Sequence, residues 1–457
     1  MKVLPTSTCF KNLYRQFHVQ FTSGQYGERE GKYICIEQVG VISTWESTFT
    51  GVLTSKMIQQ PEKEVINVNE RLHLQDPAPL YDRLLKRGPF FNGTHWILSR
   101  HAHVNALLRN QAPSKRTGNE PLANSLRKNI LFKDPPDHTR HRAAAQEFFS
   151  PRSMLLEEET ITEVATRLIA SVKEKRRMEF ISEFASRLPV AIVADYLGVP
   201  EDKHDSLFGF ARQFIFEFSN DPEMSDRGVS ELRSYFTLNI DEFMRKASPG
   251  KLLEKLAEGY RNGMLAKEEL IEMCVFLFAA GSETSGCLLG SGLLTLLQHP
   301  ESLEAIRNNP NLIPNAIEEM LRYESPVPMT TMRSTTEPME IDGLVIPEGR
   351  PVIGILAAAN RDPEKFPNPG IFDIHRNTTG HFSFGGGIHY CLGASLVRLE
   401  AKVTFRILFE QLPDLRLDNG HLPGRWLRSM SGSNKGFAFH WRERVPTRGL
   451  EYLNLKW

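Results

Sequence analysis

The sequence of 457 residues has few cysteines, no net charge and no long apolar run. Its five cysteines are odd in number and widely scattered, which argues against a disulfide framework and fits a reducing cytoplasm. Fifty-five basic residues balance 55 acidic ones, so bulk charge gives no reason to expect a nucleic-acid partner. A hydrophobic content of 40% is ordinary for a globular protein with a large core.

The sequence also lacks the signals of a membrane protein. No uninterrupted run reaches the roughly 18 apolar residues that a bilayer-spanning helix needs. The N-terminus has no charged start, apolar centre and small-residue cleavage site of a signal peptide. We therefore expect a cytoplasmic protein that does not bind a membrane.

The most informative stretch is His381–Glu400, which reads HFSFGGGIHYCLGASLVRLE. Its three consecutive glycines let the backbone approach a flat cofactor where a side chain would clash. Cys391 precedes an apolar-periodic run predicted to be helical, so free N–H groups and the helix dipole would stabilise its thiolate. Thiolate is the form that binds metal. The alternative is a glycine turn followed by a buried structural cysteine.

The letters FGGGIHYCLG resemble the haem-binding loop of the cytochrome P450 family, in the form common among soluble bacterial members. The resemblance implies that Cys391 ligates the iron of haem b. Phe384 would shield the sulfur, His389 would reach a propionate, and Gly385 and Gly393 complete the loop. The implied fold is mainly α with a small β-rich lobe, and haem lies between a long distal helix and the proximal cysteine loop.

The resemblance covers about residues 70 to 457, and we expect a single catalytic domain over residues 61–457. Residues 1–60 match nothing expected at the start of the family and are assigned as an N-terminal extension. Met57 lies just ahead of the family-like region, so a second hypothesis places the true start there. The mass of the natively expressed protein would test it.

Two cationic residues are predicted to bind a haem carboxylate. The letters DPPD at residues 134–137 are expected to cap a helix starting near His138, which places His138 and Arg142 on one face. Haem carries two carboxylates that are costly to bury without cationic donors. In the matching family motif, D-P-P-x-H-x-x-x-R, these two positions hold a propionate. The alternative is a solvated charged face.

Residues 270–298 form the longest apolar helical pattern and carry the letters AAGSET in its middle. Glycine costs about 1 kcal/mol relative to alanine in a helix, and such a local violation is typical of a functional site. By resemblance, Ala280 and Gly281 line the haem, and Gly281 opens a groove for dioxygen.

The same resemblance gives Thr284 a hydrogen bond to the bound oxygen and, with Glu283 and water, a proton relay. The alternative is a close helix crossing at Gly281, with Thr284 bonded back to a carbonyl.

Glu319 and Arg322 lie three residues apart in a helical pattern, which would ordinarily make a weak surface ion pair. In the family this E-x-x-R pair is buried, and an arginine from a later loop completes a cluster that supports the cysteine loop. Arg376 matches that third position.

The chain after this helix is expected to return beside the porphyrin, with Met329 toward the substrate and Arg333 toward a propionate. Phe276 and Ala280 complete the predicted substrate pocket, and a phenylalanine-rich segment over residues 201–262 resembles the family's lid. Residues 340–349 predict a hairpin, and residues 357–363 predict a strand leading into a loop.

The resemblance implies a monooxygenase that inserts one oxygen atom of O2 into an apolar or partly apolar small molecule, by hydroxylation or epoxidation. The chain has no room for a flavin reductase domain and no four-cysteine cluster site. Electrons are therefore expected from an external ferredoxin or flavodoxin with its NAD(P)H reductase, docking near Cys391 through basic residues such as Arg140.

Three alternatives stay open. A haem-thiolate isomerase or dehydratase would not need Glu283 and Thr284. A haem-based gas sensor would normally carry an output module, which is not evident. A metal-free enzyme with Cys391 as nucleophile would need a positioned base.

Overall fold

The computed structural model describes residues 76–110, 113–114, 128–217, 221–246, 250–418, 438–442 and 446–457. All of them belong to one compact unit, Glu62–Trp457. Met57 and the extension predicted over residues 1–60 lie outside the described residues. The division at residues 60 and 61 therefore stays a prediction.

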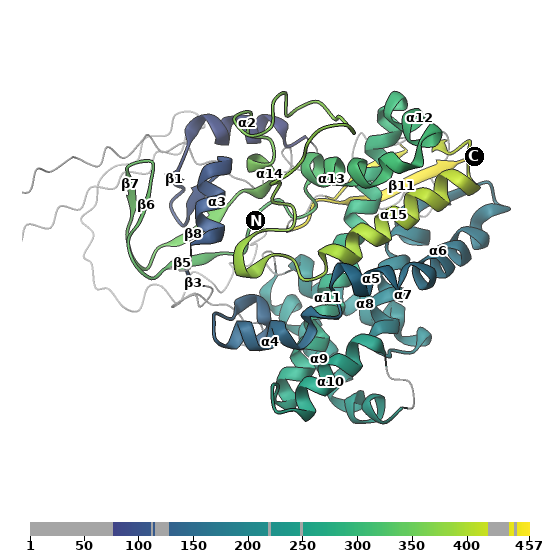
Figure 1. Cartoon of the computed structure of the whole chain (residues 1–457), viewed down its shortest axis with the longest axis horizontal. Helices are drawn as coiled ribbons and strands as arrows, with labels where there is room; N and C mark the ends of the chain where they lie inside the picture. Colours follow the sequence, from purple (N-terminus) through teal and green to yellow (C-terminus); the bar gives the residue numbers. More distant parts are fainter. Residues whose placement is uncertain are drawn as a thin grey trace, which may run out of the picture. The chain divides into compact units, whose positions relative to one another are not determined.

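Helices make up most of the described chain (Figure 1). They are α2 (Ala78–Arg87), α3 (His101–Arg109), α4 (Asp137–Gln146), α5 (Pro151–Leu155), α6 (Glu158–Lys173), α7 (Arg187–Tyr196), α8 (His204–Glu217), α9 (Pro222–Arg245), α10 (Lys251–Arg261), α11 (Lys267–Gln298), α12 (Pro300–Asn308), α13 (Ile313–Glu324), α14 (Leu356–Ala359) and α15 (Ala394–Gln411). Short 3-10 and π turns are η4 (Ile130–Phe132), η5 (Ile181–Ala185), η6 (Glu201–Lys203), η7 (Pro310–Leu312) and η8 (Gly387–His389).

The strands are short and form three small sheets among the described residues. One has the order β1 (Phe90–Phe91), β2 (Trp96–Leu98), β8 (Pro351–Gly354), β5 (Arg333–Thr335) and β3 (Pro113–Ser114). The second joins β10 (Phe439–Trp441), β11 (Leu450–Lys456) and β4 (Arg177–Glu179), with β9 (Arg416–Leu417) also paired to β11. The third is the hairpin of β6 (Met339–Ile341) and β7 (Leu344–Ile346).

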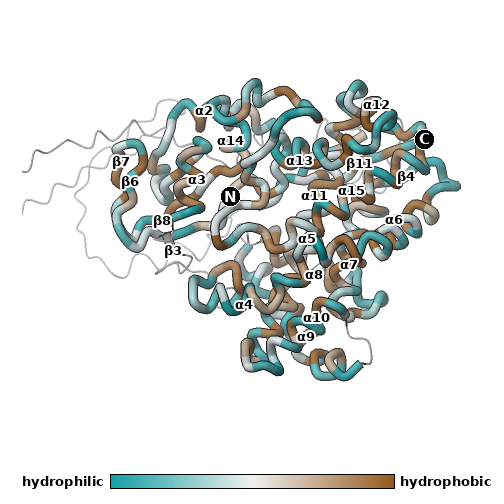
Figure 2. The backbone as a smooth tube through the Cα atoms, viewed as in Figure 1, coloured by the Kyte–Doolittle hydropathy of each residue, from teal (hydrophilic) through white to brown (hydrophobic). Residues whose placement is uncertain are grey.

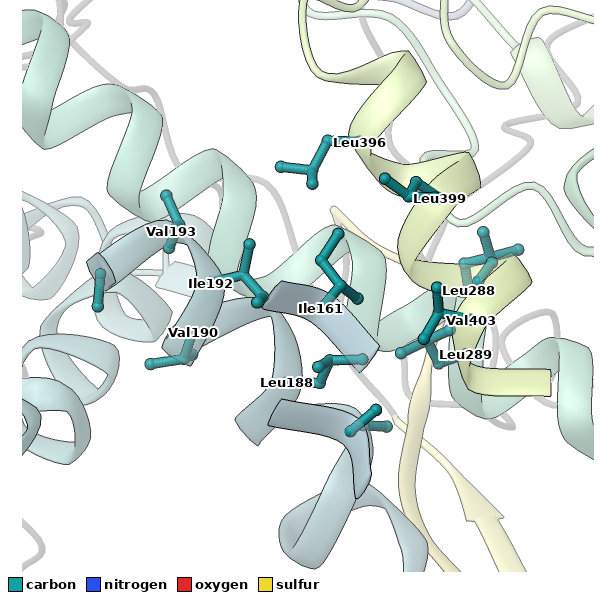
Figure 3. Close-up of a cluster of buried hydrophobic side chains, with 14 of the residues drawn as sticks. Ile161, Leu188, Val190, Ile192, Val193, Leu288, Leu289, Leu396, Leu399 and Val403 are labelled. Atoms are coloured by element: carbon teal, nitrogen blue, oxygen red, sulfur yellow. The ribbon is translucent and has the colours of Figure 1, made fainter. Parts of the chain in front are cut away.

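Helix α11 is the centre of the helical part, and α7, α8, α9, α13 and α15 all pack against it. Leu399 and Val403 of α15 lie toward Leu288 and Leu289 of α11 (Figure 3). Apolar stretches of α7, α8 and α15, brown in Figure 2, gather around α11. Of the described helices, only α11 is long and apolar enough to cross a bilayer, and 78% of that window is buried inside the protein. It is therefore packed as a core helix.

Small residues in α11 allow its neighbours to come close. A Cβ atom on Gly286 would lie 2.9 Å from the carbonyl oxygen of Ala185, and one on Gly290 would lie 2.6 Å from Cδ1 of Ile181. Both neighbours belong to η5, which leads directly into α7. Glycine at these two positions therefore lets this turn of the chain press against α11.

The predicted fold, mainly α-helical with a small β-rich part, is confirmed, with one local exception. The hairpin predicted over residues 340–349 is β6–β7, and its turn residues Asp342 and Gly343 are left-handed. The strand expected to lead into a loop at residues 357–363 is wrong, because β8 ends at Gly354 and α14 follows. Its three alanines favour helix strongly, and the sequence pattern did not weigh that preference.

Candidate active site

The cysteine loop is shaped by glycines that no other residue could replace without strain. Gly385 and Gly387 have φ angles of +67° and +65°, in the left-handed region. A Cβ atom on Gly387 would lie 2.1 Å from the carbonyl oxygen of Leu108, at the end of α3. The loop therefore presses backbone to backbone against α3 and presents Cys391 at a fixed place.

Cys391 lies just before the N-terminus of α15 and is partly exposed. Its N–H donates to the carbonyl of Phe384 at 2.9 Å, which closes the loop on itself. Burial raises the pKa of the Cys391 thiol, whereas the N–H of Gly393 and the charges of Arg142 and Arg398 lower it. Burial outweighs these groups, so the pKa of the thiol is raised overall, but the N–H and the two guanidinium charges supply positive potential that favours a metal-bound thiolate.

Within the described residues, no group of three or more His, Cys, Asp or Glu could hold a metal ion. A single protein thiolate such as Cys391 would suit an iron that a porphyrin already holds through its four nitrogens.

Arg333 provides the most direct test of whether haem fits. It is 3% exposed, and its Nη1 donates to the carbonyl of Leu107 at 3.2 Å. Its Nε has no hydrogen-bond partner, and no carboxylate of the described residues lies within ion-pair distance of it. Burial lowers the pKa of this guanidinium, while the charge of Asp134 raises it. A buried arginine left in this state fits an anionic ligand such as a propionate.

Helix α4 and the cysteine loop bring the other predicted propionate donors together. The rings of His138 and His389 lie 4.2 Å apart between centroids. Arg142, one turn further along α4, donates from Nη1 to the carbonyl of Tyr390 at 2.9 Å. Burial lowers the pKa of Arg142, and the charge of Cys391 opposes this. These cationic and imidazole groups therefore come from two elements that meet beside Cys391.

The middle of α11 carries a partly exposed stripe inside an otherwise buried segment. From residue 270 to residue 296, every residue is buried except Phe276, Ala280, Gly281 and Thr284. Positions 276, 280 and 284 are four residues apart and share one side of the helix. This is the surface that a flat cofactor held between α11 and the cysteine loop requires.

Gly281 has a structural role in addition to any catalytic one. A Cβ atom there would approach Cγ2 of Val193 on α7 to 3.2 Å, so this glycine permits a close crossing of α7 and α11. The geometry at Gly281 is therefore compatible with both hypotheses, a groove for dioxygen and a close helix crossing.

Thr284 and Glu283 are adjacent in sequence but point to different surroundings. Oγ1 of Thr284 donates to the carbonyl of Ala280 at 3.0 Å. Glu283 is 2% exposed, and its Oε1 forms an ion pair with Arg442, while Arg212 of α8 lies 3.9 Å from its Oε2. Among the described residues, no direct hydrogen bond joins the two side chains. A relay that uses both would need water or a change of partner by Glu283.

The predicted charge cluster is buried. Glu319 accepts from Nε of Arg322 at 2.6 Å and from Nη2 at 2.8 Å, and both side chains are fully buried. Nε of Arg376 lies 3.1 Å from the same carboxylate. Arg322 also donates to the carbonyl of Asn360, whose side-chain oxygen accepts from the N–H of Phe382. The cluster is thus connected to the start of the cysteine loop.

Two residues predicted to line the substrate pocket do not share one apolar cluster. Phe276 and Met329 are partly exposed and pack against different apolar clusters.

Arg140, predicted to meet a redox partner, is bound by Glu269 with two contacts of 2.6 Å, and it also donates to the carbonyl of Met264. Since Glu269 also caps α11, Arg140 ties α4 to α11, and this leaves it poorly suited to bind a redox partner.

Five charged or titratable residues in and around this site were not predicted from the sequence: Arg442, Arg398, Glu318, His381 and Glu400. Arg442 lies 159 positions from its partner Glu283, and no spacing rule connects them. Glu318 had a visible signal, because it directly precedes the buried Glu319 and must point to another side of α13.

Comparison with known proteins gives one consistent family. A family model described as Cytochrome P450 matches residues 239–412. Cytochrome P450 monooxygenase PikC of Streptomyces venezuelae is 34% identical over 84% of this chain and 91% of that protein. The biotin biosynthesis cytochrome P450 of Bacillus subtilis (strain 168) is 36% identical over 75% of this chain and 91% of that protein.

Solved structures agree. The structure of P450BioI in complex with acyl carrier protein ligated to hexadec-9Z-enoic acid has a TM-score of 0.75 and 32% identity, and the match covers 84% of this chain and 99% of that chain.

Proposed function

The chain belongs to the cytochrome P450 family, and we propose that it inserts one oxygen atom of O2 into an apolar or partly apolar small molecule, by hydroxylation or epoxidation. As a member it is an oxidoreductase of the monooxygenase type that holds haem b through a cysteine thiolate. The observation that carries the proposal is the position of Cys391, a partly exposed thiol in a glycine-shaped loop at the start of α15.

Haem, when bound, supplies the chemistry that activates oxygen. Cys391 would hold it from the proximal side, and Phe384, packed in the core, would keep water from the sulfur. The cationic groups on α4, on β5 and in the cysteine loop would hold its carboxylates; these are His138, Arg142, Arg333 and His389.

On the distal side, the hydroxyl of Thr284 would hold a proton at Oγ1 beside the oxygen site. Ala280 and Phe276 would line the substrate pocket. Glu283 would supply protons only when Arg442 releases it or water bridges the two side chains. These side-chain roles are carried over from the family motif, and the partly exposed stripe of α11 supports them.

We further propose that residues 61–457 form the catalytic domain, that the protein works in the cytoplasm and that an external ferredoxin or flavodoxin with its NAD(P)H reductase supplies electrons. Since Arg140 is engaged by Glu269, other basic residues near Cys391 would meet that partner.

The ligand is tested with three proteins: the wild type, Cys391→Ser and Cys274→Ser. The reduced carbon monoxide complex of the wild type is expected to show the red-shifted Soret band of a thiolate ligand. Cys391→Ser should lose this band, because a hydroxyl is a far weaker donor, whereas Cys274→Ser should keep it. Retention of the band by Cys391→Ser would show that another residue binds the iron.

The reaction class is tested with isotopically labelled dioxygen. Label from O2 in the product supports a monooxygenase, whereas unlabelled product or none would favour an isomerase, a dehydratase or a sensor. Candidate substrates come from a spectral-shift screen of the ferric protein, including hexadec-9Z-enoic acid free and linked to acyl carrier protein, because P450BioI was solved with that ligand.

A further inference from the structure

Arg398 lies on the first turns of α15, seven residues after Cys391, and every part of its guanidinium is engaged. Its Cζ lies 4.4 Å from the ring centre of Phe384. Nη1 lies 3.3 Å from the hydroxyl of Tyr390 and 3.5 Å from the carbonyl of Ala394. The backbone carbonyl of Phe384 in turn accepts a hydrogen bond from the N–H of Cys391. The arginine is therefore fixed over an aromatic ring of the cysteine loop itself.

Glu318 of α13 holds this arginine in place. Its Oε1 accepts from Nε of Arg398 at 2.6 Å, and its Oε2 accepts from Nη2 at 2.9 Å, which is the bidentate arrangement. Burial raises the pKa of Glu318, but hydrogen bonds from Arg398 and His381 outweigh it and bring that pKa to about 2. The pair is thus fully charged at any ordinary pH.

His381, at the start of the cysteine loop, fixes the carboxylate from the other side. Its Nε2 lies 3.0 Å from Oε2 of Glu318, and its Nδ1 accepts the N–H of Ser383 at 3.2 Å. Because Nδ1 is an acceptor, the ring proton is on Nε2 and points at Glu318. Residues of α13, of the cysteine loop and of α15 itself therefore hold Arg398 in one orientation.

We propose that Arg398 raises the reduction potential of the bound haem iron. It is a positioning residue: Glu318 and the ring of Phe384 hold its guanidinium where its positive charge acts on the sulfur of Cys391. The inference rests on the proposed role of Cys391 as the iron ligand.

The sign follows from electrostatics. Reduction adds negative charge at the iron and its sulfur, and a nearby cation stabilises the reduced form. The guanidinium lies over the buried ring of Phe384, so on this side the charge is screened less than at a free surface. Glu318 lies behind the arginine and carries the opposite charge. Removing it should therefore shift the potential in the opposite direction.

The same helix offers a matched control. Arg406, two turns beyond Arg398, pairs with Glu158 at 2.9 Å, and its side chain is 32% exposed against 36% for Arg398. Arg406→Gln therefore removes a positive charge of similar exposure, also paired with a glutamate, at a position further along the helix from Cys391.

The experiment is a dye-mediated spectroelectrochemical titration of the haem-loaded wild type, Arg398→Gln, Arg398→Lys, Glu318→Gln and Arg406→Gln. We expect the potential to fall in Arg398→Gln, to rise in Glu318→Gln and to move less in Arg406→Gln than in Arg398→Gln. Arg398→Lys should lie closer to the wild type than Arg398→Gln, because it keeps the charge. Melting temperatures of the same samples report any loss of folding.

A purely structural ion pair would loosen the loop whichever partner is removed, so both Arg398→Gln and Glu318→Gln would then shift the potential in one direction. That result, or an unchanged potential in Arg398→Gln with the red-shifted carbon monoxide band intact, overturns this inference alone. A wild-type protein that never shows the band overturns the proposed function and this inference with it.

Discussion

At the scale of single side chains, the hydroxyl of Thr284 has two possible uses. It donates to the carbonyl of Ala280, a bond that threonines often make inside helices. It also belongs to the partly exposed stripe of α11, where a reactant could meet it. The bond within the helix contributes little to stability, whereas a proton held beside an oxygen site would change the outcome of the reaction.

Thr284→Val removes the hydroxyl and keeps the shape, so it separates these uses. If the hydroxyl donates a proton at the oxygen site, the variant should bind haem normally but form several-fold less product per NADPH, with hydrogen peroxide in its place. Thr284→Ser, which keeps the hydroxyl, should stay closer to the wild type. The measurement compares NADPH consumed, product and peroxide with a substrate found in the screen. Equal coupling in Thr284→Val and the wild type would contradict the relay.

Single residues also show where sequence reasoning stops. Cys391 and the glycines around it could be predicted because a tight turn, a close approach and a ligand each demand one residue type. The partner of Glu283 could not, since Arg442 reaches it from just after β10, and its identity depends on how the paired strands β10 and β11 are placed beside α11. Contacts between segments far apart in the chain leave no periodic trace in a single sequence.

At the scale of elements, the packing of α15 against α11 and α7 contains an unexpected polar group. Glu400 of α15 is 1% exposed and has one carboxylate oxygen without a hydrogen-bond partner. Burial raises its pKa to about 8, and a hydrogen bond with Ser285 of α11 only partly opposes this. Tyr196 of α7 is close enough for Glu400 to contribute to the raised pKa of its phenol. Three helices thus enclose a carboxyl group that is largely protonated at neutral pH.

This burial predicts a pH-dependent stability. Below the ordinary pKa of a glutamate, about 4.3, both the folded and unfolded states hold the proton, and the folded state has its full stability. Between that value and about 8, only the folded state holds it, so unfolding releases a proton and stability falls by up to about 1.4 kcal/mol per pH unit. Glu400→Gln should remove this slope and gain stability relative to the wild type as the pH rises from 5 to about 8.

Urea unfolding of the haem-loaded proteins at several pH values in this range would measure the effect. Glu410→Gln is a matched control, because Glu410 is an exposed glutamate on the same helix. A difference between Glu400→Gln and the wild type that does not change with pH would show that Glu400 is not held protonated.

The elements themselves were predictable in proportion to their length. The apolar pattern of α11 and its stop at Pro300 gave nearly the observed helix, because 32 residues average out local preferences. The four residues of α14 did not, since a short segment can follow either its alanine content or the strand before it. Short elements are decided by packing, and α14 packs against α2 and α3.

At the scale of the whole molecule, two groups of elements differ in how many apolar contacts stabilise them, and haem would contribute mainly to the less well packed group. The contacts among α6, α7, α11 and α15 are dense and apolar, with many side chains fully buried. Helix α4, which would help to hold the haem carboxylates, has fewer apolar contacts, because it buries only His138, His141 and Ala145. Arg333 is buried on β5 with its hydrogen bonding incomplete. Haem would therefore stabilise one part of the chain far more than the other.

Hydrogen exchange of the haem-loaded and haem-free protein, followed by mass spectrometry, tests this uneven dependence. Removing haem takes away the carboxylates that would satisfy Arg333 and Arg142, so exchange should accelerate in residues 137–146, 327–333 and 384–393. Peptides from α6 and from the second half of α11 should keep their protection, because their contacts involve only protein. Adding haem back should restore the slow exchange. Uniform acceleration would mean that haem supports the entire fold, and no change at all would mean that these segments do not surround it.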